Sequence, residues 1–288
     1  MDKKFLNALD DWGSILTGTY EKNATTVVPT RMRADGVLKI DVEKCKDVGL
    51  LKGAIEIPEG VASVPSSAFT KCHDITNVIF PESMRTVSVF AFSECNNLKS
   101  IHFNWGVETI KSFAFAFNPS LKTINLPNSL KRIEPNAFEG CGLEGDLVIP
   151  GYIEYLGDSI FLGNKNLNGT LTIEEGIKEI PMLCFTRCNF SGHLEIPKSV
   201  VKIGLNAFRG NENLTSLKLN EGLKFIDDYA FEECSSLTGE LTIPRTVNVV
   251  GESIFNLTNF SKIYVPKVKV NKWNNNWDMG CTAEIIYY

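Results

Sequence analysis

Hydrophobic and polar positions repeat along most of this chain in units of 23 or 24 residues. Residues 121–141, LKTINLPNSLKRIEPNAFEGC, give a clear example. The unit opens with an L-x-x-I-x-L pattern in which Ile124 and Leu126 point to the same side, because side chains alternate along a strand. Pro127 follows and removes a ladder donor, which predicts that the strand ends there. Each unit is therefore expected to begin with a short strand.

The second half of each unit contains another apolar pair and then a phenylalanine, which follows an alanine in most units. In the same example, Leu130 and Ile133 form the pair, and Ala137 precedes Phe138. The small alanine allows a close backbone approach, and the phenylalanine is expected to fill the interior. A fixed period of this length is typical of a solenoid of stacked coils. Nine such phenylalanines would form one continuous column of rings: Phe69, Phe92, Phe115, Phe138, Phe161, Phe185, Phe208, Phe231 and Phe255.

Some units carry an L-x-G-x-L pattern just before the strand, with Gly145, Gly169 and Gly239 at its centre. A glycine at that point predicts a bulge or a tight bend. With strands about 4.8 Å apart, about ten coils would make a body roughly 50 Å long.

The two ends of the chain depart from the repeat. Residues 1–28 are expected to form an N-terminal cap whose helix, over residues 1–18, covers the open core of the first coil. Residues 29–52 are interpreted as a degenerate first repeat, and residues 53–265 as the regular solenoid. Residues 266–288 are expected to form a C-terminal cap, because Trp273 and Trp277 are large enough to cover the last coil.

The repeated motif L-x-x-I-x-L-P-x-x-L-x-x-I-x-x-x-A-F-x-x-C resembles the BspA-like (Treponema-type) leucine-rich repeat over about residues 53–288. The closing Val-Pro and WNNNW sequences are similar to the segment that often follows such arrays. The resemblance implies a β-rich α/β solenoid, a right-handed stack of leucine-rich-repeat coils with terminal caps. It also implies a binding or adhesion protein at the cell surface or secreted from the cell.

Composition limits the partners and the location. The chain is 43% hydrophobic and 22% charged, with a net charge of −5, and its lysines and arginines are scattered. A nucleic-acid partner is not expected, because its phosphates need clustered basic residues. No segment has the apolar length of a membrane span or of a secretory signal, so membrane insertion is not expected and a cytoplasmic location is the alternative to the surface.

Most of the eight cysteines occupy one position of the repeat. Three residues after the column phenylalanine, the coils carry Cys72, Cys95, Asn118, Cys141, Asn164, Cys188, Asn211 and Cys234. A role that suits both Cys and Asn is a small buried group that faces backbone polar groups in the turn. Reduced, structural thiols are therefore expected, although Cys72 and Cys95 lie in neighbouring coils where a disulfide is geometrically open.

The cysteines and histidines do not form a recognisable metal site or catalytic site. Cys184, Cys188 and His193 would offer zinc ligands, but both cysteines fall at core positions of the repeat. The three histidines are not paired with a nucleophile in a recognisable motif, and no glycine-rich phosphate loop precedes a helix. No metal, cofactor or enzymatic activity is therefore expected.

The outward residues of the strands form the surface that solenoids use for partners. That row includes Ile79, His102, Asn125 and Val148. Trp105 is an exception in the position after the strand-ending proline, where other coils carry polar or small residues. Trp105 is either an exposed binding residue or a side chain folded over its own coil.

These five residues are the predicted contact site for a protein or glycan partner. The favoured hypothesis is a monomeric, non-enzymatic binding module. A structural spacer without a ligand is the alternative, and an enzyme built on the repeats is a remote third.

Overall fold

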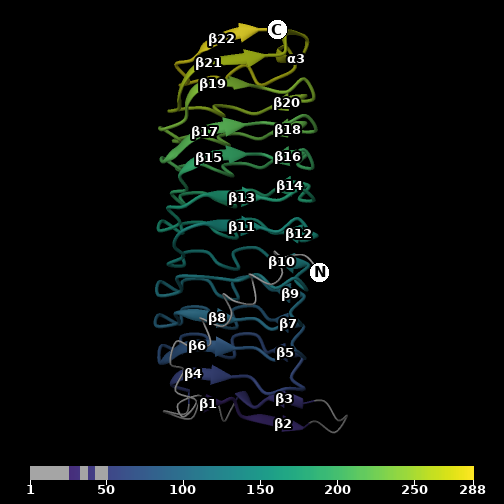
Figure 1. The fold of residues 1–288 in the computed structure, drawn as a ribbon, viewed down its shortest axis with the longest axis vertical. Coiled ribbons are helices and arrows are strands. Elements are labelled where there is room, and N and C mark those ends of the chain that lie inside the picture. Colours follow the sequence, from purple (N-terminus) through teal and green to yellow (C-terminus); the bar gives the residue numbers. More distant parts are fainter. Residues whose placement is uncertain (1–25, 33–37, 43–50) are drawn as a thin grey trace, which may run out of the picture.

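The structure, a computed structural model, describes residues 26–32, 38–42 and 51–288. Figure 1 shows a column of stacked coils that ends with the C-terminus at the top. The predicted solenoid is confirmed: about 10 turns of ~23-residue parallel repeats, with little helix. We number the coils 1 to 9 by their column phenylalanines, from Phe69 in coil 1 to Phe255 in coil 9.

One side of the column carries the strands that begin each unit, and we call this side the ribbon. Its strands pair in parallel within four groups, β1-β4-β6-β8, β11-β13, β15-β17 and β19-β21-β22. In coil 4 a single bridge between Ser100 and Thr123 replaces the strand. The ribbon strands are β1 (Thr26–Val27), β4 (Gly53–Glu56), β6 (Ile75–Ile79), β8 (Ser100–His102), β11 (Leu147–Ile149), β13 (Leu171–Ile173), β15 (Gly192–Glu195), β17 (Leu214–Lys218), β19 (Thr238–Thr242), β21 (Asn259–Val265) and β22 (Glu284–Tyr287).

A second set of two-residue strands, which we call the return strands, contains the later apolar pair of each unit. They form two parallel sheets, ordered β12-β10-β9-β7-β5 and β14-β16-β18-β20, and no pairing joins β12 to β14. The return strands are β5 (Ser63–Val64), β7 (Thr86–Val87), β9 (Thr109–Ile110), β10 (Arg132–Ile133), β12 (Tyr155–Leu156), β14 (Glu179–Ile180), β16 (Lys202–Ile203), β18 (Phe225–Ile226) and β20 (Val249–Val250).

The core is the predicted column of phenylalanine rings. Each ring is buried and stacks on the next, with centroids 4.8 to 5.9 Å apart and interplanar angles of 4° to 25°. From coil 2 onward, the residue before each ring accepts a backbone hydrogen bond from the preceding coil, as where the Phe69 N–H donates to the Ala91 carbonyl at 2.9 Å. The expected alanine is not required, because Ile160 accepts in the same way from the Phe138 N–H at 3.0 Å. The column therefore joins successive coils through both side chains and backbone.

The turn around each column phenylalanine has a backbone conformation that the sequence pattern does not predict. The residues two before and two after the phenylalanine have φ between 51° and 76° in all nine coils. Most are not glycine, and a left-handed conformation costs such a residue about 1 kcal/mol. The left-handed conformation directs alternate N–H groups towards the next coil. The N–H groups of Ser67, Phe69 and Lys71 donate to the carbonyls of Val89, Ala91 and Ser93, respectively.

Two of the three predicted glycine bends are left-handed. Gly145 and Gly239 have φ of 76° and 78°, and the pairing register shifts after Gly239. Gly169 has no positive φ; a Cβ there would lie 2.5 Å from the carbonyl carbon of Gly145, so this glycine permits a close approach instead. Register shifts also follow Gly53 and Gly192.

The ends of the column differ from the regular coils. The helix predicted over residues 1–18 lies outside the described residues. The described part of 29–52 contains an antiparallel hairpin of β2 (Thr30–Met32) and β3 (Leu38–Ile40), which places Ile40 in the core. At the other end, α3 (Lys267–Val270) precedes Trp273 and Trp277, which are both buried and pack edge to face at 5.4 Å.

Candidate binding surface

The five predicted site residues lie on neighbouring coils, and we call them the candidate patch. Ile79 of coil 2 is in register with His102 of coil 3, and Asn125 and Val148 follow in coils 4 and 5. His102 and Asn125 are exposed, Val148 is 48% exposed, and Ile79 is half-buried. Strand alternation therefore turns four of the five side chains outward on the ribbon.

Trp105 is 60% exposed, so the structure favours the exposed one of the two interpretations. It lies in the turn that follows β8. The Arg85 guanidinium holds this turn to coil 2, since its Nη1 donates to the carbonyls of Glu82, Met84 and Gly106 at 2.7, 3.0 and 3.2 Å. A Cβ at Gly106 would lie 1.9 Å from the Glu82 carbonyl oxygen, so only glycine fits there.

In other coils the position of Trp105 has a structural role. The Glu59 carboxylate accepts the N–H groups of Glu82 and Ser83 at 2.8 and 3.3 Å, and Glu175 accepts those of Lys198 and Ser199. These backbone N–H groups lower the pKa of both glutamates. An indole ring accepts no such hydrogen bond, so Trp105 does not hold the next turn as the glutamates do.

The outward row of the ribbon contains charged, paired side chains towards the C-terminus and no charged side chain in coils 2 to 6. Towards the C-terminus, outward side chains pair with each other: Lys218 with Glu195 at 2.8 Å and Lys262 with Glu240 at 3.7 Å. The hydrogen bond from Lys218 and then that from Asn220 lower the pKa of Glu195. The outward row from Ile79 to Thr172 in coils 2 to 6 contains no Asp, Glu, Lys or Arg. The outward row is therefore uncharged at the candidate patch, although Lys122 and Glu144 form an exposed ion pair just before the strand positions of coils 4 and 5.

Sequence reasoning missed Tyr152 of coil 5. Its side chain is 40% exposed, and its hydroxyl lies 3.3 and 3.2 Å from the carbonyls of Leu126 and Pro127 in coil 4. Tyr152 and Trp105 thus stand in turns on either side of coil 4. A signal was present, because the corresponding residues of the other regular coils are Gly, Ser or Thr, from Gly60 to Thr246.

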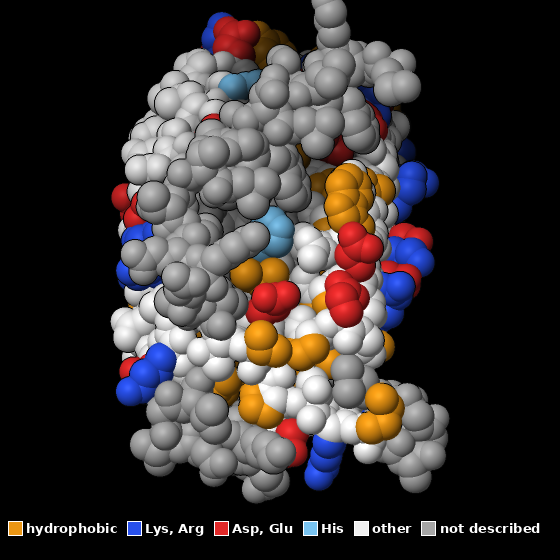
Figure 2. Space-filling model, turned by 60° about the horizontal axis from the view of Figure 1, so that its bottom comes forward, with side chains coloured by type: hydrophobic (Ala, Val, Ile, Leu, Met, Phe, Trp, Pro, Cys, Tyr) orange, Lys and Arg blue, Asp and Glu red, His pale blue; other side chains and the backbone are white. Residues whose placement is uncertain are grey.

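Figure 2, which brings the N-terminal end of the column forward, shows exposed hydrophobic side chains in separate groups with acidic side chains between them. Such a surface has no single large apolar patch among the described residues on this face.

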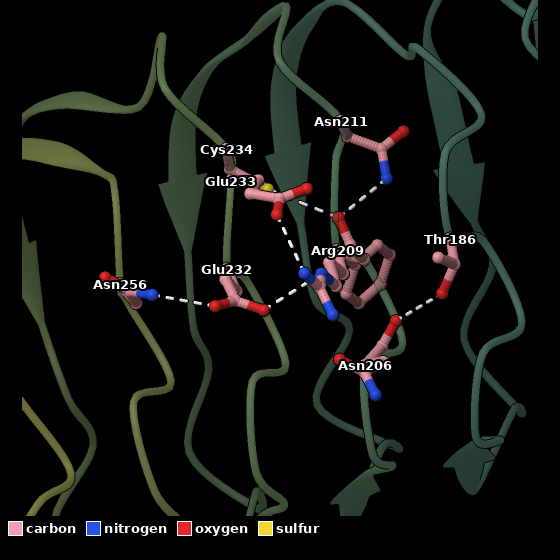
Figure 3. Close-up of polar contacts among 9 residues, drawn as sticks. Thr186, Asn206, Arg209, Asn211, Glu232, Glu233, Cys234 and Asn256 are labelled. Atoms are coloured by element: carbon pink, nitrogen blue, oxygen red, sulfur yellow. Dashed lines mark hydrogen bonds and ion pairs between the residues drawn. The ribbon is translucent and has the colours of Figure 1, made fainter. Parts of the chain in front are cut away.

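The shared role of the Cys and Asn position is confirmed. Figure 3 shows Asn211 and Cys234 beside one carbonyl, that of Phe208, to which Nδ2 donates at 2.7 Å and Sγ at 3.2 Å. Burial raises the pKa of Cys95, Cys141 and Cys234 to about 12. Cys72 and Cys95 are both free thiols. The buried thiols of Cys95, Cys141 and Cys234 are hydrogen-bond donors of the core and are poor nucleophiles.

The residues considered for zinc do not converge. Cys184 and Cys188 are buried, and the Cys188 thiol donates to the Phe161 carbonyl at 3.0 Å. His193 is exposed on β15, where its Nδ1 lies 2.8 Å from Ser216 Oγ. Over the described ranges, no three His, Cys, Asp or Glu side chains are grouped so that they could hold a metal ion. The described part of the chain also has no helix with the length and apolar character to cross a membrane.

The parallel coils, the phenylalanine column and the strand ribbon define a repeat protein of the leucine-rich class. The family model described as "BspA type Leucine rich repeat region (6 copies)" matches residues 50–168 and 169–283. The chain therefore belongs to the BspA-type leucine-rich repeat family, as its motif indicates. No curated protein matches the chain.

Two solved structures share the fold, and a third is similar at a lower TM-score. A leucine-rich repeat protein from Eubacterium ventriosum ATCC 27560 has 16% identity and a TM-score of 0.55, over 92% of this chain and 84% of that one. The T. pallidum leucine-rich repeat protein TpLRR has 22% identity and a TM-score of 0.51, over 73% and 87%. A leucine-rich cell surface protein from Faecalibacterium prausnitzii A2-165 has 20% identity and a TM-score of 0.44, over 91% and 87%.

Proposed function

We propose that this protein is a monomeric, non-enzymatic binding module that presents its ribbon to a protein or glycan partner, with the candidate patch as the contact area. The observation that carries the proposal is the exposed Trp105. It occupies a position where glutamates of other coils hold the next turn, and the fold gains nothing comparable from an indole. Exposed tryptophans are enriched among residues that dominate binding energy.

The chemistry of the patch supports the same proposal. An imidazole, an amide and two aliphatic side chains lie on coils 2 to 5, over three strand spacings or about 14 Å. The outward row here carries no charged side chain, whereas that of coils 7 and 8 carries the Lys218–Glu195 ion pair. Tyr152 extends the aromatic character of the patch beyond Trp105.

Membership of the BspA-type family bears on where the protein acts. Resemblance to BspA-type proteins favours adhesion at the cell surface or after secretion, and surface display is part of the proposal. The buried, protonated thiols and the separation of His193 from Cys184 and Cys188 support a binding role over catalysis. The alternative is a spacer in which the ribbon has no ligand.

The test begins with a photoreactive amino acid at Asn125, in the patch, or at Thr242, in the same outward row of coil 9. Molecules and immobilised glycans from the native environment that crosslink at residue 125 and not at residue 242 are candidate partners. Capture equal at both positions, or at neither, favours the spacer.

Affinity for the captured partner is then measured by biolayer interferometry. Trp105→Ala is expected to weaken binding about 30-fold, the equivalent of about 2 kcal/mol. His102→Ala, Ile79→Ala and Val148→Ala are expected to weaken it less, and Thr242→Ala is the control. Unchanged affinity in all four patch variants contradicts the proposal.

A further inference from the structure

The return strands are interrupted at the junction of coils 5 and 6. Between coils 4 and 5, the Lys131 carbonyl accepts the N–H groups of Glu154 and Tyr155, and the Ile133 carbonyl accepts that of Gly157. Coils 7 and 8 repeat the pattern, with Val201 and Ile203 as acceptors. The equivalent carbonyls of coil 5, those of Glu154 and Leu156, accept no backbone hydrogen bond from coil 6, and β12 does not pair with β14.

Pro181 accounts for part of this interruption. It occupies the place at which Gly157 and Gly204 donate their N–H groups to the preceding coil, and proline has no N–H. The same two coils approach closely elsewhere. Added Cβ atoms at Gly151 and Gly176 would lie 1.9 and 2.2 Å from backbone oxygens of the opposite coil. Coils 5 and 6 therefore touch at the ribbon turn and lack the hydrogen bonds between return strands, and they join again just after Pro181, where the Met182 N–H donates to Asp158 Oδ1 at 3.1 Å.

The missing strand pairing leaves a cavity of about 650 Å³, which we call the junction pocket. This volume is within the range of small-molecule sites. Its apolar lining includes the buried side chains of Ile153, Ile177 and Ile180, with the half-buried Leu156 and the partly exposed Met182 beside them. Leu156 and Met182 supply the apolar surface that the hydrocarbon part of a ligand can contact, because the three isoleucines are only 1% to 4% exposed.

The polar lining of the pocket is acidic. Two lysines face four carboxylates: Lys178, Lys202, Glu154, Asp158, Glu179 and Asp227. Lys202 is already paired, with its Nζ 2.8 Å from Asp227 Oδ2. The hydrogen bond with Asp227, and then the negative charges of Asp227, Glu179 and Asp158, raise the pKa of Lys202. An excess of negative charge therefore acts on any group that enters.

We propose that the junction pocket binds a small organic cation, an ammonium or amidinium group on an apolar or aromatic body. The two carbonyls without donors, those of Glu154 and Leu156, supply acceptors for its N–H groups. The carboxylates of Glu154 and Glu179 compensate its charge. The Leu156 and Met182 side chains contact its body. Anions of the same shape are repelled by the lining.

Three probes of nearly one shape test the charge requirement: benzamidine is a cation, benzamide is neutral and benzoate is an anion. Binding to the full chain is measured by titration with protein-observed NMR. Benzamidine is expected to bind at least about tenfold more tightly than benzamide, which corresponds to one charge-assisted hydrogen bond. Benzoate is expected not to bind. Equal affinity for benzamidine and benzamide, or no shift with benzamidine, overturns the proposal.

Variants test the location. Glu154→Gln and Glu179→Gln, both at exposed positions, are each expected to weaken benzamidine binding about three- to tenfold. Glu212→Gln, an exposed glutamate of coil 8 outside the pocket, is the matched control. Met182→Trp is expected to fill the pocket and abolish binding while the unfolding midpoint stays within a few degrees.

Benzamidine binding that survives Met182→Trp, or that is equal in the Glu154→Gln, Glu179→Gln and Glu212→Gln variants, also overturns the proposal. Trp105→Ala is expected to leave benzamidine binding unchanged, because that side chain does not line the junction pocket. The result is thus independent of whether the ribbon binds a partner.

Discussion

Asn164 provides a quantitative test of the Cys and Asn position. Its Nδ2 donates to the Phe138 carbonyl at 2.8 Å and to the Phe161 carbonyl at 2.9 Å. The Phe161 carbonyl also accepts the Asn164 N–H and the Cys188 thiol. The Phe138 carbonyl depends on Asn164, so Asn164→Ala leaves one buried acceptor without a donor.

An unpaired buried acceptor costs about 1–3 kcal/mol. The Oδ1 of Asn164 is itself buried without a partner, so its removal stabilises the folded state and offsets part of that loss. We expect Asn164→Ala to lower the free energy of unfolding by about 2 kcal/mol. Asn164→Cys is expected to lose less than about 1 kcal/mol, because a thiol at this position reaches the preceding carbonyl, as Cys141 reaches that of Phe115 at 3.1 Å.

The assay is urea unfolding followed by circular dichroism, with midpoint and slope compared for each variant. Asn166→Ala, at an exposed position two residues away, is the control for loss of an asparagine in the same turn. A loss below about 0.5 kcal/mol in Asn164→Ala, or equal losses in the Ala and Cys variants, would refute the donor role assigned to this position.

Three more predictions concern the core, the thiols and the ribbon turn. Phe138→Ala is expected to cost about 3–5 kcal/mol in urea unfolding, whereas Phe117→Ala, 42% exposed, should cost under about 1; similar losses would show that the column is not the core. Burial raises the pKa of Cys141 to about 12 from 9.0, because the folded state favours the protonated thiol. The contribution of this thiol to the free energy of unfolding is therefore complete below about pH 9 and declines between pH 9 and pH 12 by about 1.4 kcal/mol per pH unit. Cys141→Asn should therefore flatten the fall in urea midpoint between pH 8 and pH 10.5, and an unchanged slope would contradict the burial of the thiol. Gly106→Ala brings a Cβ to 1.9 Å from a backbone oxygen and should cost about 1–3 kcal/mol and shift Trp105 fluorescence; a neutral effect would mean that this turn is not closely packed.

The features that the sequence predicts are those that need a particular side chain in every coil. Phe138 fills the core, Pro127 ends a strand, and Asn164 donates in the turn; each is repeated, so the period exposes it. Trp105 was found as an exception to such a position. Tyr152 could have been found in the same way, because its position is otherwise occupied by small residues.

Other features depend on the backbone and could not be predicted. The left-handed positions carry residues as different as Ser67, Phe113 and Leu257, because neighbouring coils impose the conformation through hydrogen bonds. Gly140 and Gly163, which lie two residues after a column phenylalanine, are sequence features that point to a left-handed conformation there. Pro181 is visible in the sequence, but its effect on the junction of coils 5 and 6 depends on where the missing N–H would have pointed.

The left-handed positions have a consequence for how the chain folds. Both lie close to the column phenylalanine in every coil, and each disfavours the turn by about 1 kcal/mol for a residue other than glycine. The N–H groups that this conformation directs outward bond to the adjacent coil, so one coil alone lacks the hydrogen bonds that offset the cost. Folding is thus expected to nucleate on a pair of coils and to spread outward, each formed coil serving as the template for the next.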